Sequence, residues 1–205
     1  MKKIAVGGLL EGTEVSLGCM RMNALSIAEA ESLLKVSMNE GITFFDHADI
    51  YGGYTTEAAF GKALTESKVD RKKIQLITKC GIEHISENRP KNKVKHYDYS
   101  REYIIWSVEN SLKNLQTDYI DLYQMHWPER IMNMFQKRGV QEIDTKWQDN
   151  IFDVLTVYDG LIKEGKIKHI GLSNENPWGV MRFLMESEKH GLPRIATIQN
   201  PFSLL

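Results

Sequence analysis

Hydrophobic positions fall into short, nearly continuous runs that alternate with longer segments of helical spacing. The runs lie at residues 15–18, 42–46, 74–79, 119–126, 167–173 and 195–199. A run without polar alternation is typical of a strand covered on both faces, so we predict six strands of a parallel sheet. Each strand–helix pair takes roughly 30 residues, and this alternation predicts right-handed βαβ units.

The intervening segments carry recognisable helix boundaries. Ser26 with Glu29 three residues later forms a capping box, and apolar residues then follow at helical spacing. Asn176 followed by Pro177 predicts the start of another helix, which ends at Gly191. Further helices are predicted over 55–64, from about residue 100, and over 151–164.

Two architectures fit this alternation, a doubly wound open sheet and a (β/α)8 barrel. A dinucleotide-binding open sheet requires a glycine-rich turn after its first strand, whereas residues 15–20 contain only Gly18. We therefore predict an α/β barrel of the TIM type. A full barrel has eight units and typically about 250 residues, so the 205 residues are expected to form one domain, 1–205, with six of the eight βα units.

Charge and composition restrict the class of function. The chain has 26 basic and 27 acidic residues, a formal net charge of −1, which provides no general field for nucleic acid or an anionic membrane. No apolar run approaches the roughly 20 residues of a membrane span, and residues 1–10 lack a signal-peptide cleavage site. Cys19 and Cys80 cannot build a disulfide framework, so we predict a cytoplasmic protein without nucleic-acid or membrane partners.

Polar residues stand at the carboxyl end of one predicted strand after another. Asp46 ends the second strand and leads to Tyr51, Lys79 ends the third, and His126 ends the fourth. The fifth and sixth strands end in Ser173-Asn174 and Gln199. Because these ends open on one face of a parallel barrel, we expect the side chains to converge there.

The first four residue types suit proton transfer to a carbonyl oxygen. A tyrosine hydroxyl titrates near 10, and an adjacent ammonium is expected to lower that pKa. A carboxylate would hold the ammonium in place, and a histidine would orient the carbonyl. No side chain supplies hydride, so a cofactor is required. Taken singly, each residue also has a structural explanation, such as a solvated lysine or a buried imidazole.

The chain resembles the aldo-keto reductase family. Residues 45–52, FDHADIYG, are similar to the family's signature of Asp and Tyr five residues apart, and residues 77–79, ITK, to its lysine strand. Residues 118–128, DYIDLYQMHWP, resemble its histidine strand. Residues 165–174 and 198–201 resemble the segments that support the nicotinamide.

The resemblance implies a (β/α)8 fold, NADPH and the reduction of small aldehydes or ketones. It makes Tyr51 the general acid, tuned by Lys79 and Asp46, with His126 orienting the carbonyl. The predicted cofactor-binding residues are Met20, Arg21, Asp46, Ser173, Asn174 and Gln199. Met20 and Arg21 match a position near the cofactor's ribose and pyrophosphate.

The chain departs from the family pattern in two respects. The family's last two βα units, with the nicotinamide-stacking residue and the basic residues for the adenosine phosphate, are not among these 205 residues. Residues up to about 114 resemble one bacterial branch and later residues another, through divergence, recombination or construction. The alternative hypothesis is therefore a non-catalytic truncated or hybrid barrel, and open sheet edges would permit two copies to pair.

Other features are open to two interpretations. We predict no metal site, since Asp46 and His47 point to opposite faces of their strand. The long connections 84–99 and 128–150 are either substrate-recognition loops or solvated excursions. In or beside the second connection, Met125, Trp127, Met132 and Met134 either line an apolar pocket or fill the core.

Overall fold

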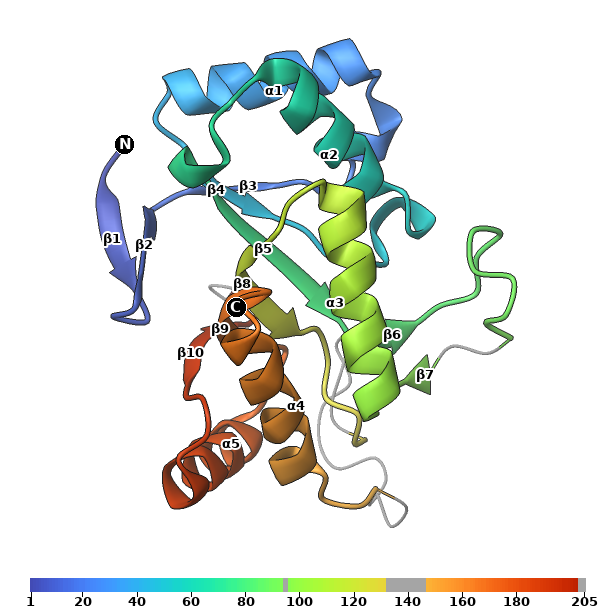
Figure 1. Cartoon of the computed structure of the whole chain (residues 1–205), viewed down its shortest axis with the longest axis vertical. Coiled ribbons are helices and arrows are strands. Elements are labelled where there is room, and N and C mark those ends of the chain that lie inside the picture. The colour runs from blue at the N-terminus through green and yellow to red at the C-terminus, as the bar shows by residue number, and fades with distance from the viewer. Residues whose placement is uncertain (94–95, 132–146, 203–205) are drawn as a thin grey trace.

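Six parallel strands form one sheet in which spatial neighbours follow the order of the chain (Figure 1). The computed structural model describes residues 1–93, 96–131 and 147–202. The strands are β3 (Ser16–Gly18), β4 (Phe44–Asp46), β5 (Gln75–Cys80), β8 (Ile120–Met125), β9 (Ile167–Ser173) and β10 (Ile195–Gln199). Their order, β10-β9-β8-β5-β4-β3, never reverses. A doubly wound sheet reverses at a switch point, so the barrel-type winding predicted from the sequence is confirmed.

Each crossover between consecutive strands contains a helix, and Figure 1 shows these helices in an arc around the strands. They are α1 (Ile27–Asn39), α2 (Thr56–Ser67), α3 (Arg101–Leu115), α4 (Ile151–Lys163) and α5 (Pro177–His190). Both predicted caps are present: the Ser26 hydroxyl and the Glu29 carboxylate each accept a backbone N–H of the other residue, and the Asn176 side chain accepts Gly179 N–H at 2.9 Å. Among the described helices, none has the length and apolar character to cross a membrane.

Two hairpins are not predicted from the sequence. Residues 1–10, which in the sequence suggest only a possible signal peptide, contribute to the antiparallel pair β1 (Lys3–Val6) and β2 (Leu10–Thr13). The turn of this hairpin lies against β10 so closely that a Cβ on Gly7 would fall 2.0 Å from Ala196 O. A shorter hairpin, β6 (Ile82–Glu83) with β7 (His96–Tyr97), lies within the connection after β5.

Alternation along β4, β5 and β8 builds two layers on the inner face of the sheet. Phe44, Ile77 and Leu122 form an apolar layer, which Leu10 of the β1–β2 hairpin covers. The residues two positions later in each strand are Asp46, Lys79 and Gln124, all buried. Since side chains two residues apart share a face, a polar layer lies above the apolar one, towards the carboxyl ends of the strands.

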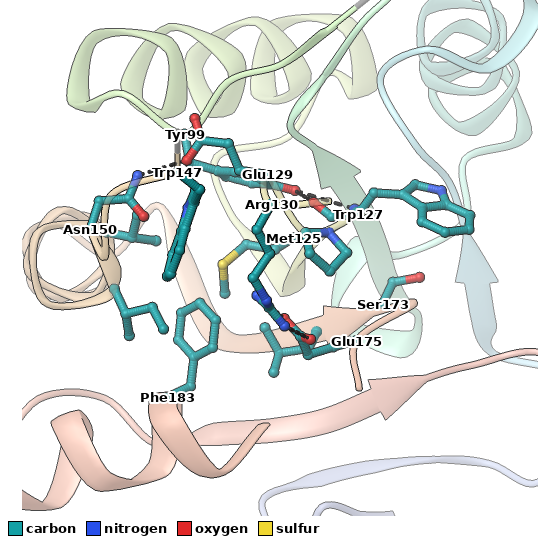
Figure 2. Close-up of a pocket in the computed structure, with 14 residues that line it drawn as sticks. Tyr99, Met125, Trp127, Glu129, Arg130, Trp147, Asn150, Ser173, Glu175 and Phe183 are labelled. Atoms are coloured by element: carbon teal, nitrogen blue, oxygen red, sulfur yellow. Dashed lines mark hydrogen bonds and ion pairs between the residues drawn. The ribbon is translucent and has the colours of Figure 1, made fainter. Parts of the chain in front are cut away.

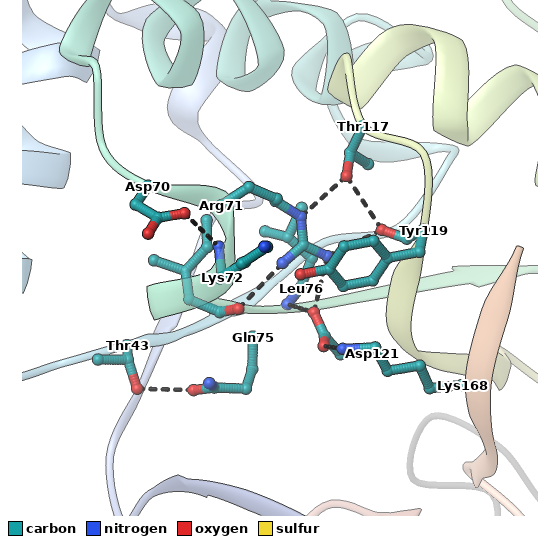
Figure 3. Close-up of polar contacts among 11 residues, drawn as sticks. Thr43, Asp70, Arg71, Lys72, Gln75, Leu76, Thr117, Tyr119, Asp121 and Lys168 are labelled. Carbon is teal, nitrogen blue, oxygen red and sulfur yellow. Dashed lines mark hydrogen bonds and ion pairs between the residues drawn. The ribbon is translucent and has the colours of Figure 1, made fainter. Parts of the chain in front are cut away.

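Asp121 joins three strands at the opposite, amino-terminal end of the sheet (Figure 3). Its carboxylate accepts Arg71 Nη2 at 2.7 Å, Lys168 Nζ at 2.8 Å and the Leu76 N–H at 3.0 Å. Arg71 precedes β5 in the 3-10 turn Arg71–Lys73, whereas Lys168 belongs to β9. This network aligns β5 and β8, two of the three strands that carry the polar layer, with β9.

Two buried carboxyl groups lie on the helix side of the sheet. Asp49 belongs to the segment that follows β4, and Glu57 belongs to the first turn of α2. Asp49 accepts Ser107 Oγ at 3.1 Å, and Glu57 accepts Thr78 Oγ1 at 2.6 Å. Burial raises the pKa of Asp49 to about 8, and the Glu57 carboxyl adds to this effect. The pKa of Glu57 is also raised, chiefly by burial. Both groups help to fix the segment between Asp46 and the following helix α2.

Replacing Asp121 tests the strand-joining network. Asp121→Ala leaves the Leu76 N–H and the Arg71 guanidinium without their carboxylate, so we expect the free energy of unfolding to fall by about 2–4 kcal/mol. Urea denaturation measures this change. The matched control is Asp159→Asn, which removes an exposed i,i+4 pair with Lys163 on α4 and should cost less than about 0.5 kcal/mol. Equal losses in the two variants would contradict the role given to Asp121.

The buried Asp49 predicts a pH dependence of stability. Because its pKa is raised in the folded state, the folded chain binds a proton that the unfolded chain has lost between about pH 4 and pH 8. Stability from this group is therefore greatest below pH 4 and declines by up to roughly 1.4 kcal/mol per pH unit until about pH 8.

Asp49→Asn should flatten that decline in denaturation curves recorded from pH 5 to pH 8. Asp118→Asn, a change at an exposed position, serves as the control and should leave the slope unaltered. A slope that persists unchanged in Asp49→Asn would show that Asp49 is ionised in the folded chain.

Candidate active site

The structure brings together the four residues predicted to act on a carbonyl. Asp46 ends β4, Lys79 lies on β5, His126 follows β8, and Tyr51 begins the 3-10 turn Tyr51–Gly53. We call these four residues the tetrad. Strands β4, β5 and β8 are consecutive neighbours in the sheet, so three of the four side chains come from adjacent carboxyl ends.

Lys79 lies at the centre of the tetrad and is only 1% exposed. Its ammonium donates to Asp46 Oδ1 at 2.7 Å and to His47 O at 2.8 Å, and lies 3.5 Å from the Tyr51 hydroxyl. Burial lowers the pKa of Lys79, while the Asp46 carboxylate opposes that shift. The carboxylate and the backbone carbonyl together satisfy a charge that the interior would otherwise disfavour.

The predicted effect of Lys79 on Tyr51 is wrong for the chain by itself. From the sequence, the ammonium is predicted to lower the pKa of the hydroxyl. Instead burial raises the pKa of Tyr51, and the Asp46 carboxylate and the Cys19 thiol add to that increase. The physical reason is first that burial disfavours the phenolate, and second that Asp46, at 2.7 Å from the ammonium, opposes the positive charge that lies 3.5 Å from Tyr51. Tyr51 is therefore a protonated phenol at neutral pH.

His126 and Cys19 complete the surroundings of the tetrad. The His126 and Tyr51 rings meet edge to face with centroids 5.9 Å apart, and His126 is 8% exposed. The Cys19 N–H donates to Asp46 O at 2.9 Å, which places this buried thiol beside the tetrad. This position of Cys19 is not predicted from the sequence, because its proximity to Asp46 depends on the pairing of β3 with β4.

A second group of predicted residues follows β9 and β10. Asn174 adopts a left-handed conformation, with φ of 58°, and its side chain donates to His126 O at 2.9 Å and to Ser173 Oγ at 3.0 Å. Its N–H donates to Gln199 O at 3.0 Å. Ser173, Asn174 and Gln199 therefore form one connected group, which Asn174 joins to the tetrad.

Met20 and Arg21 lie at the other side of the tetrad. They follow β3, whereas Ser173 and Gln199 end β9 and β10 at the opposite end of the strand order. Both are exposed, Met20 to 60%. Apart from Asp46, which belongs to the tetrad, the predicted cofactor-binding residues thus flank the tetrad on two sides. In the order of the described strands, β3 and the β9–β10 pair lie at opposite edges of the sheet.

The ambiguous residues have structural explanations. His47 is fully buried against Phe60 with ring centroids 4.4 Å apart, and burial lowers its pKa to about 3. Cys19 and Cys80 are free and buried. Glu83, His96 and Asp98 each bring one potential ligand atom within 4.8 Å of the others, but all three side chains retain solvent contact. The absence of a metal site therefore remains a prediction from the sequence.

The two long connections differ in how much the structure shows. In the first connection, residues 84–99, Arg89 and Lys91 line a cleft of about 500 Å³ together with Trp106 of α3. This connection therefore packs against the helix. In the second, Met132 and Met134 lie outside the described residues. Met125 and Trp127 both line a pocket between the carboxyl ends of β8 and β9 and the helices α4 and α5 (Figure 2).

That pocket contains a pair of residues that sequence reasoning missed. Arg130 and Glu175 form a buried ion pair across it. The sequence contained a signal, since each follows a predicted site residue closely, Arg130 after His126 and Glu175 after Asn174. The partnership itself depends on the pairing of β8 with β9, which brings residues 45 positions apart together.

Comparisons with known proteins agree with the geometry. Residues 14–205 match the model of the aldo/keto reductase family. The chain is 40% identical over 176 residues to the uncharacterized oxidoreductase YcsN of Bacillus subtilis, covering 85% of this chain and 53% of that protein. It is 38% identical over 203 residues to the protein Tas of Escherichia coli, covering 96% of this chain and 58% of Tas.

A solved structure shows the same fold. The aldo-keto reductase AKR11C1 from Bacillus halodurans, in its holo form, superposes with a TM-score of 0.76 and 30% identity, covering all of this chain and 59% of that one. The present chain thus spans little more than half the length of each of these three proteins. Its strand order, its tetrad and these similarities establish that the chain belongs to the aldo/keto reductase family.

Proposed function

We propose that this chain carries the catalytic residues of an NADPH-dependent reductase that converts small aldehydes or ketones to alcohols. The observation that supports it best is the tetrad, in which Lys79 contacts Asp46 and lies 3.5 Å from the Tyr51 hydroxyl. The relatives support oxidoreductase chemistry in general. When bound, a reduced nicotinamide supplies the hydride that no side chain can provide.

The proton step belongs to Tyr51. Its raised pKa keeps the hydroxyl protonated, so it is ready to donate as negative charge develops on the carbonyl oxygen. Loss of the proton leaves a phenolate 3.5 Å from the Lys79 ammonium, which stabilises that anion only as it forms. One hydride and one proton added across the C=O bond give the alcohol and the oxidised cofactor.

His126 is proposed to orient the carbonyl oxygen. Its ring meets Tyr51 edge to face, so a substrate oxygen that reaches the Tyr51 hydroxyl lies beside the imidazole. The backbone of His126 is fixed on both sides, because its N–H donates to Cys80 O and its carbonyl accepts from Asn174. These two hydrogen bonds fix the backbone of the histidine beside the tyrosine.

The residues after β9 and β10 fit a nicotinamide carboxamide. Within the described residues, Asn174 uses its amide nitrogen on protein acceptors and has no protein donor at its amide oxygen. The Ser173 hydroxyl and the exposed Gln199 amide add a donor and further amide groups. This set can accept from the carboxamide nitrogen and donate to its oxygen. Met20 and Arg21 are proposed to contact the cofactor from the other side.

Several finer properties are part of this proposal. The use of NADPH and a small carbonyl compound as partner rest on the resemblance, and a cytoplasmic location rests on the resemblance and on the two free cysteines. Pairing of two copies through the β3 and β10 edges is proposed on the strand order. The alternative is a chain that keeps the tetrad as a scaffold without turnover.

Tyr51→Phe separates these two functions. Removing the hydroxyl should lower kcat by about 100-fold or more, because the general acid is lost, while NADPH binding changes less than about twofold. Oxidation of NADPH during a screen of aldehydes measures kcat, and quenching of tryptophan fluorescence measures binding. Tyr119→Phe, at the amino-terminal end of β8, is the control. Binding without turnover in the unmodified chain would support the scaffold alternative.

The charge balance around Tyr51 predicts how pH affects the reduction rate. Because its pKa is raised, the rate should not fall through loss of the Tyr51 proton between about pH 6 and pH 9. Lys79→Met leaves Asp46 facing Tyr51 without a counter-ion, which raises the Tyr51 pKa further. Turnover should then fall by at least about tenfold and the alkaline limb of the pH–rate profile should move to higher pH.

The double variant Lys79→Met with Asp46→Asn is the control for this effect. It removes both charges, so the alkaline limb should return towards that of the unmodified chain while turnover stays low. An alkaline limb that is the same in Lys79→Met and in the unmodified chain would refute the tuning role of Lys79.

A further inference from the structure

Arg130 and Glu175 form a two-pronged ion pair in the interior of the protein (Figure 2). Arg130 Nη1 donates to Glu175 Oε2 at 3.0 Å, and Nη2 donates to Glu175 Oε1. The two residues are 9% and 4% exposed. A paired fork of this kind fixes direction as well as distance, because the planar guanidinium matches both carboxylate oxygens at once.

The surroundings of this pair are shaped to hold it. The guanidinium lies 4.9 Å from the centre of the Trp178 ring and 5.8 Å from that of Trp147. The first turn of α5 has Gly179 at the point of contact, where a Cβ would come within 2.3 Å of both charged side chains. The residue at that position must therefore be glycine for the pair to form as it does. Arg130 also contacts Asn176, the cap of α5.

The pair connects the loops that carry the two halves of the candidate active site. Arg130 lies four residues after His126, and Glu175 follows Asn174 directly. Because Asn174 is in the left-handed conformation, its side chain turns back to the His126 carbonyl while Glu175 reaches Arg130. A third loop joins here, since Asn200, next to Gln199, donates to Glu175 O at 2.9 Å.

We propose that Arg130 and Glu175 are positioning residues, which fix the loop bearing His126 relative to the loops bearing Ser173, Asn174 and Gln199. In catalytic terms, the pair sets the separation between the group that orients the carbonyl and the groups that hold the nicotinamide. This catalytic consequence rests on the proposed function, whereas the tie between the loops does not.

Stability alone does not account for such a pair. Burying two charges costs about as much as their attraction returns, and well-packed apolar side chains of similar volume commonly serve as well or better. What apolar side chains do not supply is a directional link between two loops. Misplacement of reacting groups by about 1 Å can cost roughly 100-fold in rate, so this link has a measurable consequence for turnover.

The test uses Arg130→Met combined with Glu175→Met, which removes both charges and retains most of the volume. We expect this folded variant to show a kcat lowered by about 10- to 100-fold and a Kd for NADPH raised by about fivefold or more. Arg130→Lys, which keeps the charge but not the fork, should recover part of the loss seen in Arg130→Met. Arg182→Met is the matched control, since it removes a half-buried arginine of α5 that pairs with Asp149 and Glu186.

Amide hydrogen exchange gives a measurement that does not depend on turnover. The N–H groups of His126 and Asn174 donate to Cys80 O and Gln199 O, and we expect both to exchange at least about tenfold faster in the double variant and to be unchanged in Arg182→Met. Unaltered exchange, or a double variant with unaltered kcat and Kd, would overturn the proposal. If the unmodified chain reduces no carbonyl, the proposed function fails, while the exchange experiment still decides whether the pair ties the loops.

Discussion

The buried contact between Lys79 and Asp46 is the constraint on which the site depends. An ammonium that is 1% exposed is tolerated only where a carboxylate and a carbonyl oxygen meet it, and here these are Asp46 Oδ1 and His47 O. Both acceptors come from the carboxyl end of β4, and the ammonium comes from β5. The pairing of these two strands therefore has to be correct before Tyr51 has a cation beside it.

The rest of the fold keeps that pairing in register. Next to the polar layer, Phe44, Ile77 and Leu122 form an apolar layer that packs against the β1–β2 hairpin. A shift of one residue in the pairing of these strands would move polar side chains into this apolar layer. At the far end, Asp121 ties β8 to β9 and to the turn before β5. Charged groups thus lie at both ends of the strands, with apolar packing between them.

Beyond the strands, the site is assembled through loops, and each tie there crosses from one loop to the next. Asn174 bonds the His126 carbonyl, and the Arg130–Glu175 pair makes a second tie between the same two loops. Asn200 extends the connection to the loop after β10. These contacts consequently hold the loop that carries His126 beside the loops that carry Asn174 and Gln199.

The sequence by itself determined the winding of the sheet and the content of the tetrad. Strand-forming runs, caps such as Ser26 with Glu29, and polar residues at strand ends are local signals, and their order along the chain implies one catalytic face. The sequence did not determine the sign of the Tyr51 pKa shift, because that depends first on how deeply the hydroxyl is buried and then on the Asp46 carboxylate beside it.

Tertiary structure alone decided the remaining features. The β1–β2 hairpin packs against β10 and against the inner face of the sheet. Residues 1–13 alone do not indicate either packing partner. The Arg130–Glu175 pair joins residues 45 positions apart, and although each closely follows a predicted site residue, their partnership depends on the packing of β8 beside β9. Local preference specifies an element, whereas burial, and with it the pKa and the partner of a charge, depends on which elements pack together.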